Sequence, residues 1–241
     1  EQVFKVGKKL CTKMFNAAKF AIGRFCDVDT AKLTPDAITQ EVDRAMIAEL
    51  RPLLRRATTA FDAFDYAQAL SVIEDFFWRM LCDNYLEIAK PRTYDEELTV
   101  ERLSACAALR LSLRMIVRLF APFVPYITEE IWQWAFAADS DMNPSVHKSP
   151  WPSLAEIESI PAPQQEALWT VTLAVVEQVR KAKADASLSM AAPVKSVNIT
   201  CTPDAKKCIE TAADDITRML RIEALTITEA DGDMQVNITF E

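Results

Sequence analysis

The chain has 241 residues, of which 50% are hydrophobic, and carries a formal net charge of −8. This length and composition provide a sizeable hydrophobic core and exclude a disordered chain. Only three glycines occur, which argues against Gly-rich nucleotide-binding folds. No apolar run reaches the length of about 18 residues that a membrane span requires. The sequence therefore predicts a mainly α-helical protein with no membrane segment.

The charge is unevenly distributed. Residues 1–26 carry a net charge of +5, which leaves −13 for the rest of the chain. The six cysteines show no C-x-x-C spacing, and the single histidine offers no ligand cluster, so we expect reduced thiols and no metal. The first residues are neither an initiating methionine nor a signal peptide, which favours a cytoplasmic fragment of a longer protein.

Five segments with helical apolar periodicity follow one another in the first part of the chain. They are expected at residues 4–25, 41–64, 65–89, 100–120 and 126–136. Pro52 should kink or end the second helix, and the third should end before Pro91. Helices joined by connections of moderate length predict a helical bundle over residues 1–150.

The second part of the chain changes its pattern twice. A proline-rich loop leads into a long helix over 164–186, and this linker and helix are assigned to residues 151–192. Beyond Pro193, alternating runs flank a helical segment, and the last two runs lie on either side of an Asp231-Gly232 turn. Residues 193–241 are therefore predicted to form a small β-α-β-β subdomain.

Motifs of catalysis are absent from the sequence. It has no Gly-rich phosphate loop, no G-x-S-x-G and no H-E-x-x-H. His147 lies in the proline-rich loop and is expected to serve packing or hydrogen bonding. Glu129 and Glu130 lie in the first turn of a helix, where carboxylates favour the N-terminus. We expect no catalytic residue in this chain.

Two other groups of residues are interpreted as structural. One side of the fourth helix is expected to form salt bridges with the acidic body rather than phosphate contacts. It carries Arg102, Arg110, Arg114 and Arg118. Trp78 and Trp132 fit the buried stripes of their helices.

Phe20 is the exception in the first helix. At 100° per residue it projects toward Lys9, Lys13 and Asn16, with Arg24 slightly further round. One interpretation is that another part of the protein covers the ring, as is usual for large apolar residues. The other is that the ring stacks on an unpaired RNA base while the lysines contact phosphates.

Three blocks of this sequence resemble the anticodon-binding region of class I aminoacyl-tRNA synthetases of the valine, isoleucine and leucine group. "TKMFNAAKF" is similar to N-K-x-x-N-A-x-[RK]-F, and "DFFWRMLCDNYLEIAKPR" to F-x-W-x-x-F-C-D-x-Y-[LI]-E-x-x-K-x-R. "LFAPFVPYITEEIWQ" is similar to H-P-F-x-P-F-x-[TA]-E-E-[IL]-W-Q. "SVHKSPWP" resembles a block typical of the valyl enzymes. The resemblance spans nearly the whole chain and implies a class I synthetase anticodon-binding helical bundle.

The resemblance implies that this chain positions tRNA for an ATP-dependent aminoacylation, with ATP bound by a catalytic domain that lies outside this sequence. Valine-accepting tRNA and that catalytic domain are the partners it implies, and the fragment itself would hold no cofactor. The implied tRNA-binding residues are Lys9, Lys13, Asn16, Lys19, Phe20 and Arg24, of which Lys9 and Arg24 are added by helical geometry alone. Lys90 and Arg92 are weaker candidates, for tRNA contact or domain docking.

Other functions compete with this one. The same domain could belong to an isoleucyl or leucyl enzyme. A helical scaffold that binds protein partners would instead cover the basic stripe with an acidic partner, and RNA would not compete for it. A stand-alone RNA-binding paralogue is the third alternative.

Overall fold

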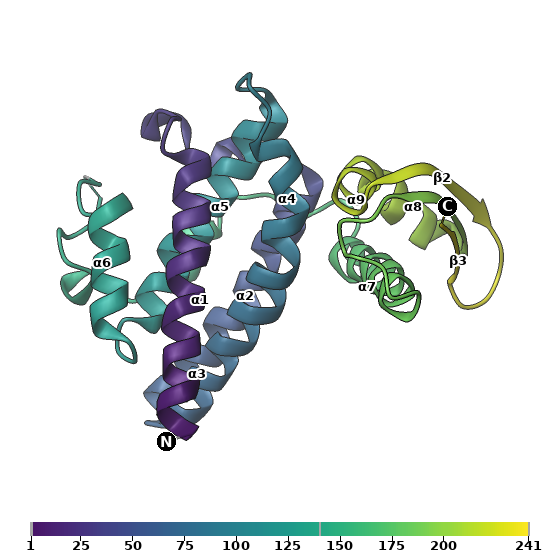
Figure 1. Ribbon diagram of the computed structural model, residues 1–241. Coiled ribbons are helices and arrows are strands. Elements are labelled where there is room, and N and C mark those ends of the chain that lie inside the picture. Colours follow the sequence, from purple (N-terminus) through teal and green to yellow (C-terminus); the bar gives the residue numbers. More distant parts are fainter. Residues whose placement is uncertain (1, 140, 241) are drawn as a thin grey trace.

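The computed structural model describes residues 2–139 and 141–240 and consists of an elongated helical bundle beside a smaller α+β subdomain (Figure 1). The mainly α-helical prediction is confirmed. The bundle contains α1 (Gln2–Phe25), α2 (Glu41–Asp62), α3 (Tyr66–Asp75), the π-helical η3 (Phe76–Tyr85), α4 (Leu86–Thr93), α5 (Val100–Phe120) and α6 (Pro125–Ala135). Short 3-10 turns occupy the connections, at Thr30–Lys32, Pro35–Ala37, Val146–Lys148 and Leu154–Ile157.

Helix α5 is the central element of the bundle, and α1, α2, α4 and α6 all pack against it. It is buried over most of its length, including the polar side chains of Ser104 and Ser112. The hydroxyl oxygen of Thr99 accepts a hydrogen bond from the Arg102 backbone N–H and so caps the first turn. The predicted bounds of this helix, 100–120, are confirmed.

The two prolines do not end their helices, which leaves the kink as the remaining prediction for Pro52 and makes the predicted end before Pro91 wrong. Helix α2 continues through Pro52, and α4 continues past Pro91 to Thr93. A proline inside a helix costs about 3 kcal/mol because it removes one backbone donor and clashes with the preceding turn. In α2, Leu50, Leu53 and Leu54 beside the proline are almost fully buried, and this burial offsets the cost.

The middle of the predicted third helix is π-helical, which the periodicity did not reveal. Residues 76–85 form η3, between α3 and α4. The Asn84 side chain donates a hydrogen bond of 2.7 Å to the Arg79 carbonyl within this segment. Arg180 of the long helix α7 (Leu168–Asp185) donates in turn to the Asn84 side chain at 2.8 Å. The π-helical segment is thus fixed by hydrogen bonds from inside and from the neighbouring subdomain.

The C-terminal subdomain places a three-stranded sheet beside helices, as predicted in outline. Its elements after α7 are β1 (Val194–Cys201), α8 (Pro203–Thr211), α9 (Ala213–Leu220), β2 (Ile222–Glu229) and β3 (Gln235–Thr239). The strand order is β2-β1-β3, with β1 parallel to β2 and antiparallel to β3. The last two runs lie on either side of Asp231-Gly232, as predicted, and each pairs with β1 rather than with the other. The single predicted helix is divided into α8 and α9.

A buried ion-pair cluster joins this subdomain to the bundle. Arg92 at the end of α4 donates two hydrogen bonds to Asp43 of α2, at 2.7 and 2.9 Å, and one to Asp215 of α9 at 2.7 Å. Tyr85 and Ser104 donate their hydroxyl protons to the same Asp43 carboxylate. Helix α7 packs on α2 as well. The two parts are therefore held by charge pairing and packing across their boundary.

Candidate nucleic-acid interface

The N-terminal half of α1 forms one side of a cationic groove. The groove has a volume of about 470 Å³. Its lining is formed by Lys5, Lys8, Lys9, Thr12, Lys13, Asn16 and Trp78. Four ammonium groups and one indole on a shallow surface provide what single-stranded nucleic acid requires, which is charge for phosphates and an aromatic ring for a base.

Lys13 lies at the centre of the groove and has two partners. Its Nζ is 3.2 Å from the Asp83 carboxylate and 5.2 Å from the centroid of the Trp78 ring. The ion pair is solvent-exposed, with 34% of the Lys13 side chain accessible, so it is weak and exchanges readily for a phosphate. The cation over the indole keeps the lysine beside the ring.

The other predicted residues of the stripe are accessible. Lys9, Asn16 and Lys19 are exposed, and across residues 2–139 and 141–240 the structure gives their side chains no hydrogen bond or ion pair. Lys19 lies on the same helix beyond the groove. The structure therefore presents three of the sequence candidates to solvent, together with Lys13.

The ring of Phe20 is neither fully buried nor fully exposed. Its ring is partly buried and packs against the hydrophobic core. The Nζ of Lys90 and the guanidinium of Arg24 both lie 5.7 Å from its centroid. The interpretation that another part of the protein covers the ring is thus partly confirmed, and stacking of the ring on an RNA base stays a prediction.

Arg24 continues this row of cations and rings toward the end of α1. Its guanidinium lies 4.2 Å from the ring centroid of Tyr94, the residue that follows α4. Tyr94 is 56% exposed, and its sequence position gave no sign that it would lie beside α1. The contact is a product of the packing of α4 against α1.

Arg92 does not belong to this interface, which corrects its assignment to tRNA contact, whereas the docking alternative agrees with its ion pairs to α2 and α9. The residue is only 3% exposed, and its donors are used by Asp43 and Asp215. Lys90 is different, because 41% of its side chain is accessible, and its Nζ pairs with the exposed Glu87 at 3.2 Å and lies beside Phe20. The "KPR" sequence therefore gives one surface cation and one buried one.

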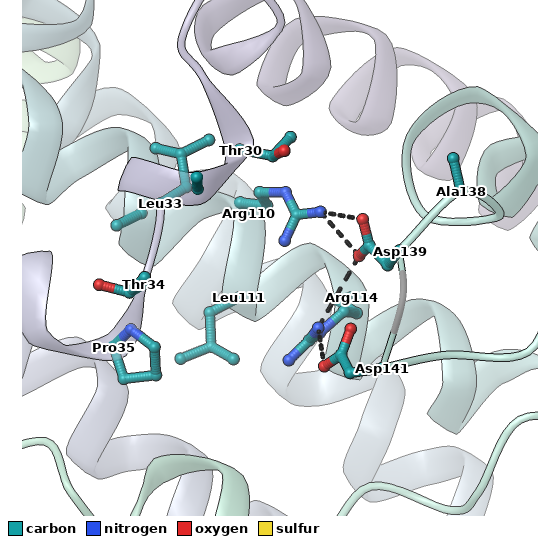
Figure 2. A pocket seen from close by; sticks show the side chains of 12 residues that line it. Thr30, Leu33, Thr34, Pro35, Arg110, Leu111, Arg114, Ala138, Asp139 and Asp141 are labelled. Carbon is teal, nitrogen blue, oxygen red and sulfur yellow. Dashed lines mark hydrogen bonds and ion pairs between the residues drawn. The ribbon is translucent and has the colours of Figure 1, made fainter.

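The row of arginines on α5 forms salt bridges, as expected. Arg102 pairs with Asp27 at 2.6 Å, and Arg118 pairs with Glu156. Figure 2 shows Arg110 and Arg114 turned toward Asp139 and Asp141 at the edge of a pocket of about 430 Å³. These guanidinium groups are neutralised by carboxylates and are not free for phosphate.

The two tryptophans assigned to buried stripes differ in exposure. Trp132 is fully buried, as predicted, and its Nε1 donates to the Asn143 carbonyl at 2.9 Å. Trp78 was assigned to a buried stripe but is only partly buried and lines the groove. At 100° per residue Trp78 lies about 180° from Ala69, on the opposite side of the helix from the apolar stripe, so helical counting by itself indicates an outward position.

The groups once considered for catalysis have structural contacts. Burial alone would raise the pKa of Glu129, but hydrogen bonds from Gln133, Ser145 and the Val146 backbone lower it overall. His147 lies 3.1 Å from the Pro125 carbonyl through Nε2. Burial raises the pKa of the Cys82 thiol to about 12, which leaves it protonated and unreactive. The described residues contain no cluster of His, Cys, Asp or Glu suited to a metal and no helix able to cross a membrane.

A helical bundle with one cationic, aromatic-lined face defines a class of nucleic-acid-binding domain. Comparison with known families specifies it further. Residues 43–199 match the family described as the anticodon-binding domain of tRNA ligase, and the chain belongs to that family. The match begins in α2, so α1 with its basic groove lies outside it.

Relatives of the chain are valine–tRNA ligases from several bacteria. The protein from Thermobifida fusca is 38% identical over 99% of this chain, and that from Cutibacterium acnes is 38% identical over 92%. A Wolbachia relative is 32% identical over 95%. The chain spans about a quarter of the length of these curated relatives, from 24% to 26%.

Proposed function

We propose that this chain is the tRNA-binding part of a valine–tRNA ligase. In this function the α1 face binds the anticodon loop of valine-accepting tRNA. A catalytic domain elsewhere in the full-length protein then joins valine to that tRNA in an ATP-dependent reaction, and this chain itself contributes no catalytic residue. The proposal combines the family membership, the names of the relatives and the cationic groove.

The groove on α1 is the observation that carries the proposal. The chain beyond residue 26 is strongly acidic, and the α5 arginines Arg102, Arg110 and Arg118 form ion pairs with carboxylates. Lys9, Lys13 and Lys19 are instead concentrated on one exposed helix face. An acidic protein that keeps one strip of accessible cations is organised for an anionic partner at that strip.

The expected role of each residue follows from its chemistry. The lysines contact phosphates. Asn16 offers a donor and an acceptor to a base edge. Phe20 supports Arg24 and Lys90 and presents the remaining part of its ring to a base. An unpaired loop is the RNA structure that exposes bases to such side chains.

The test is a titration of valine-accepting tRNA with the full chain at low salt, by filter binding. The double variant Lys9→Gln/Lys13→Gln should bind more weakly, and the slope of log K against log salt should fall by about 0.7 to 0.9 for each phosphate contact removed. Phe20→Ala should lose about 1 to 3 kcal/mol on this tRNA and much less on an anticodon-mutated tRNA. Lys207→Gln, on α8 in the other subdomain, is the matched control.

The result also separates the alternatives. Wild-type affinity in the double lysine variant would refute the proposed site. A helical scaffold predicts that an acidic protein partner protects α1 and that excess tRNA does not displace it. The isoleucyl and leucyl alternatives predict tighter binding of their own tRNAs, which the same titration measures.

A further inference from the structure

Cations and aromatic rings alternate along the seam between α1 and the chain from η3 to Tyr94. Lys13 lies over Trp78 at 5.2 Å, Lys90 and Arg24 lie over Phe20 at 5.7 Å, and Arg24 lies over Tyr94 at 4.2 Å. Three of these four contacts join different segments of the chain, and the Arg24–Phe20 contact lies within α1. The row continues beyond the groove that the proposed function uses.

Tyr94 is the most accessible ring in this row. It is 56% exposed, whereas Phe20 and Trp78 are only partly exposed. Nothing in the hydrophobic core requires an aromatic side chain at this position, since the ring is not among the residues packed against it. An exposed ring with a guanidinium already stacked on it is a prepared platform for a further planar group.

The hydrogen-bonding capacity of the Arg24 guanidinium is not fully used. Its Nε is buried and, within the part of the chain that the structure describes, has no hydrogen-bond partner. Among the described residues Arg24 forms no ion pair with the nearby acids, because Asp27 pairs with Arg102 at 2.6 Å and Asp95 pairs with Arg218 at 2.8 Å. Arg24 therefore retains a charge that an RNA ligand can use.

Glu96 limits which part of an RNA fits here. It lines a small polar pocket of about 240 Å³ together with Arg24 and Tyr94, and none of the described residues forms an ion pair with it. A carboxylate without a cation repels phosphate. The group suited to the Tyr94 end of the seam is therefore a base, with its phosphate turned toward Arg24 and Lys90.

We propose that Tyr94 is a base-stacking residue for a second unpaired nucleotide of the bound RNA, and this inference rests on the proposed function. With an α-helical rise of 1.5 Å per residue, the chain from Leu86 to Tyr94 spans roughly 12 Å, and the π-helical residues from Trp78 to Tyr85 add to that length. One nucleotide cannot cover both rings at that separation. The seam therefore binds an unpaired RNA segment of several nucleotides, with bases at both ends.

The test compares three tyrosine variants of the full chain by fluorescence anisotropy with a labelled anticodon stem-loop of valine-accepting tRNA. Tyr94→Ala should weaken binding about tenfold to a hundredfold, and Tyr94→Phe should retain binding within about twofold because the ring remains. Tyr126→Ala is the control, because Tyr126 is 90% exposed but lies on α6, away from α4 (Figure 1). Glu96→Gln should strengthen binding, since it removes a charge that repels phosphate.

The two proposals fail in different ways. If Tyr94→Ala binds like the wild type while Lys9→Gln/Lys13→Gln binds weakly, the stacking role of Tyr94 is wrong and the proposed function stands. If the double lysine variant also binds like the wild type, the proposed function is wrong. Equal losses in Tyr94→Ala and Tyr94→Phe would also overturn the stacking role, because they would assign the effect to the hydroxyl group.

Discussion

Arg92 provides the sharpest prediction about how the two parts of this protein are held together. Replacing it by methionine keeps most of the side-chain volume and removes the guanidinium. Arg92 is 3% exposed and donates to both Asp43 and Asp215. The Arg92→Met variant would leave two carboxylates in the interface without their cation.

The expected loss of stability follows from what each carboxylate retains. Breaking a buried ion pair by removing one partner costs about 3 to 5 kcal/mol. Asp43 keeps hydrogen bonds from Tyr85 at 2.8 Å and from Ser104 at 2.6 Å, which offset part of the cost. Burial already raises the pKa of Asp215 to about 6, so this group can take up a proton instead. We therefore expect a loss near the lower end, about 3 kcal/mol.

The assay is urea unfolding followed by far-ultraviolet circular dichroism at pH 7. Arg79→Met is the control, since Arg79 forms an exposed i,i+4 pair with Asp75 and should lose less than about 1 kcal/mol. At a temperature where Arg92→Met is still folded, its affinity for tRNA should equal that of the wild type. A stability loss below about 1 kcal/mol for Arg92→Met, or a direct loss of RNA affinity in the folded variant, would refute this reasoning.

Three further predictions concern stability. First, burial raises the pKa of Asp215 in the folded state from 3.8 to about 6, so the folded protein binds a proton that the unfolded chain releases. The free energy of unfolding should therefore fall as the pH rises from about 4 to 6. In a plot of the urea midpoint against pH, Asp215→Asn should flatten this decline. Second, Lys183→Met should lower the free energy of unfolding by about 2 to 4 kcal/mol, because the buried Nζ donates three hydrogen bonds to backbone carbonyls. An unchanged urea midpoint would contradict this. Third, Thr99→Ala should lower stability by about 1 kcal/mol by removing the cap of α5, whereas Thr99→Ser should restore it.

Much of the helical architecture could be predicted because long amphipathic segments carry a strong periodic signal. The bounds of the helix at 100–120 were predicted correctly, since its apolar periodicity is strong and prolines follow it. Pro91 misled the prediction, because the local backbone cost of a proline was weighed without the tertiary packing that offsets it. Strand pairing was also missed, because alternation indicates a strand but not its partner.

The candidate site was only partly accessible to sequence reasoning. The basic face of α1 could be found because all its residues lie on one helix. Tyr94 could not, since its position beside α1 depends on the packing of α4. Trp78 was missed because it was assigned to the buried stripe, although helical counting places it on the opposite side of its helix. The burial and ion pairing of Arg92 could not be predicted either, because its partners Asp43 and Asp215 lie 49 and 123 residues away in the chain.

The sequence by itself determined the mainly helical fold, the α+β end of the chain and the concentration of positive charge on α1, because each is written in local periodicity and composition. The tertiary structure alone decided which charges remain available to a ligand. Arginines that look alike in the sequence became buried pairs on α4 and α5 or a stacked surface cation on α1. The physical reason is that the cost of burying a charge depends on partners that only folding brings within a few ångströms.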